Sequence, residues 1–289
     1  HSSSDLTQAI AHRLEISAGD IIHYEVFKRS HDARKKGNIR LIYQLDVELA
    51  SALETALLER CTNPDLYRPS PDTSYRLLAN ADTEFPSATQ QRPIIIGFGP
   101  CGILTALLLA QMGLRPIVLE RGKAVRERTK DTWAFWRNRE LNTESNVQYG
   151  EGGAGTFSDG KLYSQVKDKR HLGRKVMMEF VKAGAPEEIL YVSKPHIGTF
   201  KLVKMVENIR AEIIRLGGEI RFGEKVDRLL LEPTASGADQ QVNGLVLASG
   251  ETLHSHHVVL AIGHSARDTF QMLQDADVYI EPKPFSIGF

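Results

Sequence analysis

Three glycines and one carboxylate have the spacing that a dinucleotide-binding turn requires. Gly97, Gly99 and Gly102 form the pattern G-x-G-x-x-G, and Glu120 follows 18 residues after the last of them. In this pattern the first glycine permits a tight turn, the second lets a pyrophosphate approach the backbone, and the third lets a helix pack closely on a strand. The N-terminus of that helix offers N–H groups and partial positive charge to phosphates. These residues predict a site for the diphosphate of a nucleotide.

The neighbours of these four residues complete the candidate site. A carboxylate at Glu120 can accept hydrogen bonds from both hydroxyls of an adenosine ribose, and it would repel a 2′-phosphate, which disfavours NADP. Pro100 and Cys101 occupy variable positions of the turn and Arg121 follows the carboxylate, so all three are candidate cofactor-binding residues. Cys101 is interpreted as a small filler, and a reactive thiol at a helix N-terminus is the alternative.

The elements around the motif are those it needs. Residues 93–96 predict an apolar strand, residues 103–112 a helix, and residues 116–119 a second buried strand that ends at Glu120. The glycine turn therefore lies between a strand and a helix, with the carboxylate at the end of the next strand. An ordinary glycine turn of an α/β fold is the alternative, and this context disfavours it.

A second glycine-rich segment, GEGGAGTFSDGKL, spans residues 150–162. Such glycine density lets the main chain pass close to a ligand where side chains would clash. Beyond it, residues 195–232 predict a helix followed by a strand, and residues 241–266 predict a strand pair followed by a buried strand. That last strand ends in Ala261, Ile262 and Gly263.

This succession resembles flavoproteins of the glutathione-reductase type, in which a hairpin precedes a strand ending A-T-G near the cofactor. GGAGTFSDGKL, PHIGTFKL, AIGHSARDTF and the N-terminal VFKRSHDARKKGNIRLIYQLDVE are similar to a group of bacterial FAD-dependent dehydrogenases of unestablished activity. The resemblance covers nearly the whole chain and implies FAD as the cofactor. It adds six candidate cofactor-binding residues: Gly152, Gly153, Gly155, Thr156, Ala261 and Gly263.

The resemblance also implies a later strand, a G-D dipeptide that binds ribitol and a helix that faces the flavin. The chain ends at Phe289 in PKPFSIGF, before any such segment. We therefore expect the C-terminal part of the FAD fold to be absent here. We also expect this chain to hold FAD weakly or not at all.

Two functions stay open. The first is an FAD-dependent oxidoreductase that passes hydride through flavin N5 to an unidentified small-molecule substrate or electron acceptor. Its catalytic candidates are Lys161 and His264. The alternative interpretation of Lys161 is a surface lysine, and that of His264 is a hydrogen-bonded loop histidine. The second is an FAD-binding interaction or sensor protein whose basic hairpin contacts a partner or RNA. That hairpin carries Lys28, Arg29, Arg34, Lys35, Lys36 and Arg40.

We predict an α/β fold: a Rossmann-like parallel sheet with a hairpin or meander insertion, preceded by a small α+β domain. The domain boundaries are residues 1–65 for the small domain, 66–91 for a proline-containing linker and 92–289 for the dinucleotide-binding domain. Within the first, residues 6–14 and 50–59 predict helices, and residues 21–29 and 39–49 predict strands.

The amino-acid composition limits the binding partners and the location that we expect for the protein. The 36 basic residues balance the 36 acidic residues, so net charge does not favour nucleic acid or an anionic membrane. Two cysteines are too few for a disulfide framework, and no metal pattern is present, so we expect no metal and a location in the cytoplasm. In residues 121–139 we expect a solvated charged helix face, with Trp133 and Trp136 in the core.

Overall fold

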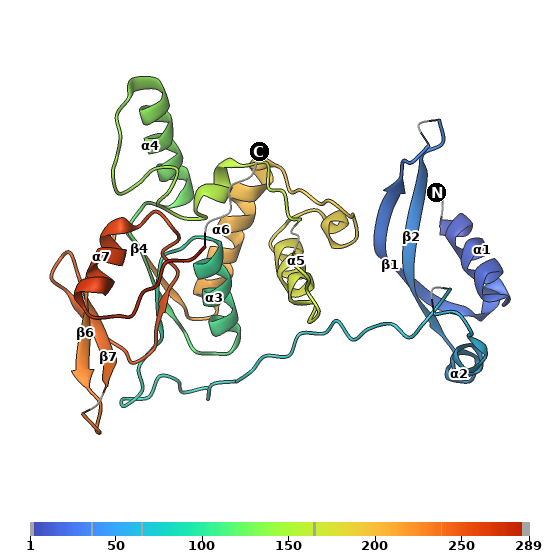
Figure 1. Ribbon diagram of the computed structural model, residues 1–289, viewed down its shortest axis with the longest axis horizontal. Coiled ribbons are helices and arrows are strands. Elements are labelled where there is room, and N and C mark those ends of the chain that lie inside the picture. The colour runs from blue at the N-terminus through green and yellow to red at the C-terminus, as the bar shows by residue number, and fades with distance from the viewer. Residues whose placement is uncertain (1–2, 36, 65, 164–165, 238, 285–289) are drawn as a thin grey trace. The chain divides into compact units, whose positions relative to one another are not determined.

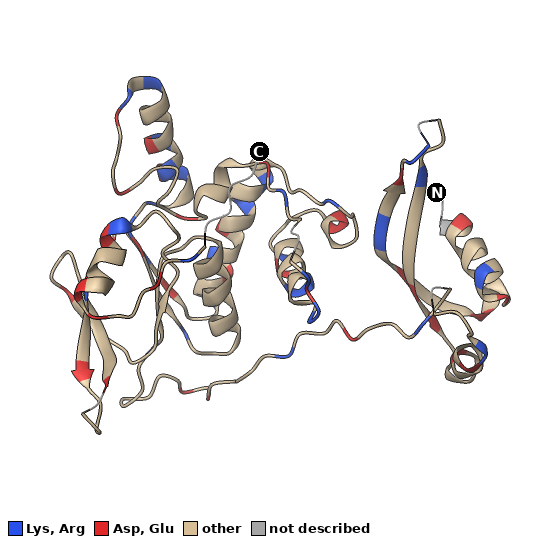
Figure 2. Ribbon diagram, viewed as in Figure 1, with Lys and Arg blue, Asp and Glu red and all other residues tan. Residues whose placement is uncertain are grey.

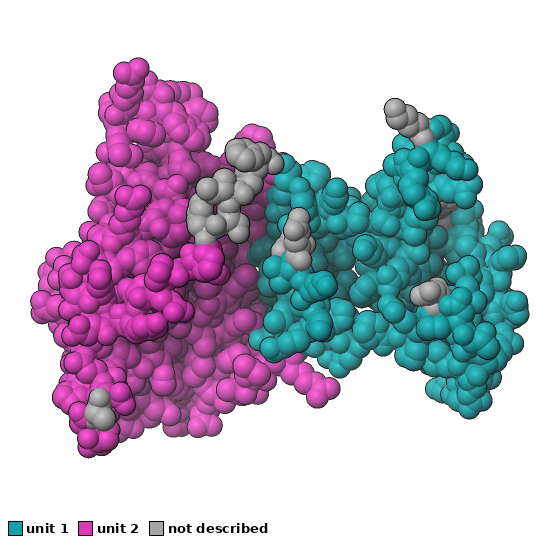
Figure 3. All heavy atoms as spheres, viewed as in Figure 1, with its two compact units in different colours: residues 1–75, 161–181, 186–196 teal, residues 76–160, 182–185, 197–289 magenta. Residues whose placement is uncertain are grey.

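The computed structural model describes residues 3–35, 37–64, 66–163, 166–237 and 239–284. Lys36 of the basic hairpin and residues 285–289, with Phe289, lie outside the described residues. The chain forms two compact units (Figure 3). Unit 1 contains residues 1–75, 161–181 and 186–196, and unit 2 contains residues 76–160, 182–185 and 197–289. This division differs from the predicted domain boundaries, because residues 161–181 and 186–196, which lie within the predicted dinucleotide-binding domain, belong to unit 1.

Unit 1 is built on a long antiparallel hairpin of β1 (Ile21–Asp32) and β2 (Arg40–Leu49), as the sequence predicts. The return of residues 186–196 to this unit has a backbone cause. Arg29 forms a parallel bridge with Val192, and its N–H donates to the Tyr191 carbonyl at 2.6 Å. The remaining elements of this part of the chain are α1 (Ser3–Leu14), η1 (Ala18–Asp20), α2 (Ser51–Arg60), α5 (Leu172–Lys182) and η3 (Glu187–Leu190).

Unit 2 contains a four-stranded parallel sheet in the order β5-β4-β3-β9. Its strands are β3 (Ile94–Ile96), β4 (Ile117–Glu120), β5 (Glu219–Phe222) and β9 (Val258–Leu260). The inner strand β3 is three isoleucines, all buried. Such an unbroken apolar run suits a parallel strand that is covered on both faces.

Helices and a meander complete unit 2 (Figure 1). The meander has the order β6-β7-β8 and is antiparallel, and it shares an apolar core with the parallel sheet through Ile94, Leu119 and Leu245. Its presence confirms the predicted fold class of a parallel sheet with a meander insertion. Among the described residues, no helix is both long and apolar enough to cross a membrane. The elements are α3 (Pro100–Gln111), α4 (Val125–Asn138), η2 (Ala154–Phe157), α6 (Thr199–Arg215), β6 (Val226–Pro233), β7 (Gln240–Leu247), β8 (Thr252–His254) and α7 (Arg267–Asp275).

Helix α4 corrects two expectations. Trp133 and Trp136 are 46% and 53% exposed, so the prediction that they belong to the core is wrong. The helix instead buries Val125, Arg128 and Thr132, which lie three and four residues apart on one face. Figure 2 shows basic and acidic residues along this helix, yet the expected solvated charged face includes Arg128, which is fully buried.

Candidate functional site

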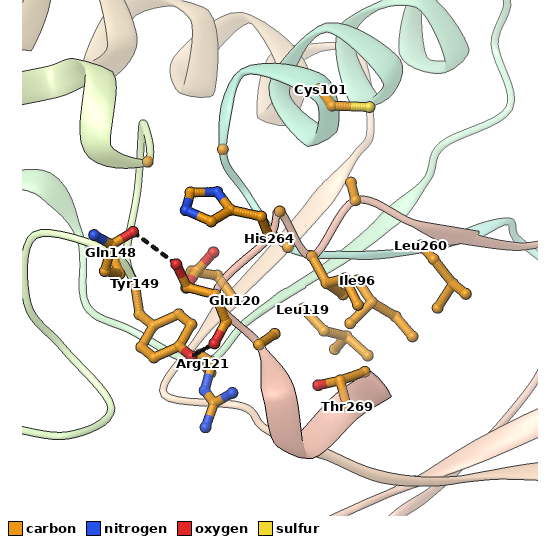
Figure 4. A pocket seen from close by; sticks show the side chains of 18 of the residues that line it. Ile96, Cys101, Leu119, Glu120, Arg121, Gln148, Tyr149, Leu260, His264 and Thr269 are labelled. Carbon is orange, nitrogen blue, oxygen red and sulfur yellow. Dashed lines mark hydrogen bonds between the residues drawn. The ribbon is translucent and has the colours of Figure 1, made fainter. Parts of the chain in front are cut away.

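A cavity of about 580 Å³ lies in unit 2 at the carboxyl ends of β3, β4 and β9. This is the edge where open α/β sheets bind ligands, and the volume lies within the range of roughly 300–1,000 Å³ that small-molecule sites occupy. Figure 4 shows side chains from the glycine turn, the second strand end and the last strand end gathered around it. Of the sequence-predicted residues, those that line the cavity are Gly97, Gly99, Pro100, Cys101, Glu120, Arg121, Gly153, Gly155, Ala261, Gly263 and His264.

The three glycines of the turn differ in what surrounds them. Gly97 has a φ of +101°, and a Cβ there would overlap the carbonyl oxygen of Ala261. At Gly102 a Cβ would overlap the carbonyl oxygen of Gly97, so this glycine lets α3 pack against the end of β3. At Gly99 the nearest atom to a Cβ would be the Gly153 Cα at 3.9 Å. Two glycines are thus required by packing, and Gly99 faces open space.

The second glycine-rich segment and the glycine at the end of the last strand divide in the same way. A Cβ on Gly155 or on Gly263 would meet nothing within 4 Å, and both residues line the cavity. A Cβ on Gly152 would instead overlap the hydroxyl oxygen of Thr156, which is itself buried. Gly152 and Thr156 therefore support the wall from behind and do not line the cavity in the described chain. That Gly152 and Thr156 bind a cofactor stays a prediction.

Glu120 is buried and accepts hydrogen bonds from the backbone N–H groups of three loops. Its Oε2 lies 2.7 Å from the Phe98 nitrogen, and its Oε1 lies 2.8 Å and 2.9 Å from the nitrogens of Gly122 and Gly150. A carboxylate offers about four lone-pair positions. The described amides use three of them, so Glu120 has capacity for about one ribose hydroxyl, where the sequence predicted two.

Arg121 lines the cavity, but its guanidinium is held by two carboxylates and one ring. It pairs with Glu144 at 2.7 Å and with Asp268 at 2.9 Å, and it lies 4.2 Å from the centre of the Tyr149 ring. Although burial opposes the charge, the hydrogen bonds to Asp268 and Glu144 raise the pKa of Arg121 above its usual range. The Arg121 guanidinium in turn holds the pKa of Asp268 well below its usual range.

Part of the cavity lining is apolar, and we call this part the apolar end; sequence reasoning did not identify it. Val226 begins the meander, Leu260 ends β9, and Phe270 and Leu273 come from α7. The only signal was the helical spacing of the last two. An apolar wall beside a polar turn is the composition of most cofactor sites, and it suits a flat heteroaromatic ring.

The two catalytic candidates lie in different units. His264 lines the cavity, and its ring points toward the side where Gln148 and Tyr149 lie (Figure 4). Lys161 belongs to unit 1, where it forms an antiparallel bridge with His196. The described part of the chain contains no group of three or more His, Cys, Asp or Glu side chains arranged to hold a metal ion.

Comparison with known proteins gives two sequence matches. Residues 1–48 match the family described as Domain of unknown function (DUF8436). An uncharacterized protein of Clostridium beijerinckii is 42% identical over 286 residues, which cover 98% of this chain and 50% of that protein. The chain therefore spans about half the length of the curated relative it matches.

Solved structures resemble the chain at low identity. THI4 of Thermovibrio ammonificans is 17% identical with a TM-score of 0.45, and the match covers 65% of this chain and 64% of that one. L-proline dehydrogenase of P. horikoshii is 14% identical with a TM-score of 0.35, with coverage of 66% and 57%. Likenesses at these TM-scores do not by themselves assign a function.

Proposed function

We propose that unit 2 binds FAD through its adenosine diphosphate part, and that the whole protein is an FAD-dependent oxidoreductase. One observation carries this proposal. The open glycine Gly99, the N-terminus of α3, the strand-end carboxylate Glu120 and an apolar pocket end all face one cavity. A dinucleotide presents, in order along its length, a diphosphate, a ribose and a flat base, which are the groups that these features suit.

The residues present fit this group. The room at Gly99 and Gly155 suits close approach of a pyrophosphate. Pro100, the first residue of α3, has no N–H, so the N–H groups of Cys101 and Gly102 in the first turn are the ones that suit its oxygens. The remaining lone pair of Glu120 suits one ribose hydroxyl. The adenine would lie against Val226 and Phe270. When bound, the flavin supplies hydride transfer at N5.

The side chains would serve binding and orientation. The ion pairs with Glu144 and Asp268 would hold the Arg121 side chain in a fixed position at the edge of the site. His264 is the candidate in this unit for holding or moving a proton. A catalytic role of Lys161 stays a prediction. The proposal also includes a small-molecule substrate and an electron acceptor, neither of which is identified.

Calorimetric titration of the purified chain with FAD, ADP and 2′,5′-ADP tests the proposal. ADP should bind, and FAD should bind weakly, with an affinity similar to that of ADP. The 2′,5′-ADP should bind at least about tenfold more weakly, because its 2′-phosphate would lie against the Glu120 carboxylate. A folded chain that binds neither FAD nor ADP would overturn the assignment, and tight binding of 2′,5′-ADP would redirect it to another cofactor.

A further inference from the structure

Arg128, on α4, is a fully buried cation whose partners are main-chain carbonyl groups. Its Nε donates to the carbonyl of Asn146 at 2.7 Å, and its Nη2 donates to Val147 at 2.7 Å and Gly153 at 2.9 Å. Its Nη1 donates to Glu151 at 2.6 Å and, more weakly, to Gly150 at 3.4 Å. All of these carbonyls belong to residues 146–153, which we call the glycine loop.

The charge of Arg128 is balanced by carboxylates only at a distance, although its guanidinium carbon lies 4.8 Å from the centre of the Phe157 ring. No carboxylate among the described residues forms an ion pair with it, and burial lowers the pKa of Arg128 to about 10. The negative charges of Glu120 and Glu151 favour the protonated form. Because a buried charge is costly unless its hydrogen bonds are satisfied, the glycine loop must keep its carbonyls turned toward this one guanidinium.

The backbone of Gly150 lies between two opposite charges. Its N–H donates to Glu120 at 2.9 Å, and its carbonyl accepts from Arg128. A Cβ on Gly150 would overlap the Cδ atom of Arg128, which explains why glycine is needed there. The Glu120 carboxylate therefore holds the N–H of Gly150, and the Arg128 guanidinium holds its carbonyl group.

We propose that Arg128 is a positioning residue for the dinucleotide site, acting through the glycine loop. Tyr149, Gly150 and Gly153 line the cavity, and two of them bond to Arg128 through their carbonyls. The guanidinium therefore shapes the wall that the ligand meets without touching the ligand. This proposal rests on the proposed function, since it assigns Arg128 to the same site.

ADP affinity of three variants tests it: Arg128→Met, Arg128→Lys and the control Arg126→Met. Arg126 lies on the same helix but is exposed and pairs with Glu207. At a temperature where circular dichroism shows each variant folded, Arg128→Met should lose at least about tenfold in ADP affinity. Arg126→Met should stay within about twofold of the wild type.

The lysine variant gives a readout that a purely structural role would not move. A buried lysine has its pKa lowered by desolvation, so Arg128→Lys should lose ADP affinity progressively from about pH 7 to about pH 9. The wild type should change much less, because its guanidinium keeps the proton. The charged groups that face this position are Glu120 from β4, Glu151 from the glycine loop and, beyond it, Arg210 from α6. The wild type and the variant share all of them.

The outcomes separate this proposal from the assignment of the site. If the wild type binds ADP and a folded Arg128→Met binds it equally well, the positioning role is wrong and the site assignment stands. If Arg128→Met does not fold, the Arg128→Lys profile decides, and a profile parallel to the wild type overturns the role. A wild type that binds neither ADP nor FAD overturns both.

Discussion

Glu120 holds the amides of three loops together, so at the scale of single residues its removal should affect both binding and stability. We predict that Glu120→Ala lowers ADP affinity at least tenfold, because a hydrogen bond to a charged group contributes about 1.5–3 kcal/mol. The variant should also unfold at lower denaturant concentration. Calorimetry and urea denaturation measure the two effects, and a loss below tenfold in a folded variant would show that Glu120 acts on the loops alone.

Gly99 gives a cleaner test of ligand approach, because its backbone is extended, with φ −77° and ψ −172°, and a Cβ there would make only an ordinary contact, with the Gly153 Cα at 3.9 Å. Gly99→Val should therefore fold normally, yet place a branched side chain where the pyrophosphate must lie. Its FAD affinity should fall at least about tenfold. Gly37→Val, at an open position of unit 1, is the matched control. Wild-type FAD affinity in the folded Gly99 variant would contradict the placement of the diphosphate.

Glu151 should give stability an unusual pH dependence. Burial raises the pKa of its carboxyl above the ordinary value of 4.5, against the Val125 amide and the charge of Arg210. The protonated form is therefore favoured by folding, and this contribution to stability is present at low pH and lost as pH rises through the folded pKa. The unfolding free energy of the wild type minus that of Glu151→Gln should fall with rising pH over the range that begins at 4.5, the ordinary value for this carboxyl. Urea denaturation across this range measures the difference, and a constant value would argue against the raised pKa.

At the scale of elements, α7 closes the apolar end of the cavity with Phe270, which is 39% exposed. Phe270→Ala should weaken ADP binding by about three- to tenfold, since an aromatic contact contributes roughly 0.5–1.5 kcal/mol. Phe200→Ala serves as the control, because Phe200 is 93% exposed and does not line the described cavity. Equal affinities of the two variants would place the adenine elsewhere.

The elements around the glycine turn could be predicted because their signals are local. The three isoleucines of β3, the glycine turn of α3 and the strand end at Glu120 lie within 27 residues of sequence, from Ile94 to Glu120. The strand pair within residues 241–266 was predicted from the succession of elements, and its place as a hairpin or meander insertion came from the resemblance to flavoproteins. The structure confirms the resulting fold class.

The remaining features depend on backbone partners, which leave no pattern in side-chain types. Arg128 resembles any other charged residue of α4, because the carbonyls that bind it exist at every position of a chain. The return of residues 186–196 to unit 1 rests in part on the bridge between Arg29 and Val192. The apolar end of the cavity likewise takes residues from α7, β9 and β6. These elements come together only in the folded chain, so no local sequence pattern marks them as neighbours.

At the scale of the whole molecule, the chain spans half of its Clostridium beijerinckii relative. The groups that we assign in the cavity address the adenosine diphosphate part of FAD. We therefore predict that ADP and FAD bind the 289-residue chain with dissociation constants within about tenfold of each other. Competition calorimetry measures both. A much tighter FAD complex would mean that the cavity also holds the isoalloxazine ring.

The glycine loop has a consequence for motion. Residues 146–153 contain no helix or strand, yet the Gly150, Glu151 and Gly152 amides donate to Glu120, Lys123 and Phe98. Amide protons held in this way exchange with solvent only when the structure opens locally. These three should therefore exchange as slowly as those of a sheet, even without ligand. A nucleotide would then meet a wall that is already ordered, and its association should follow a single fast phase with no slow rearrangement.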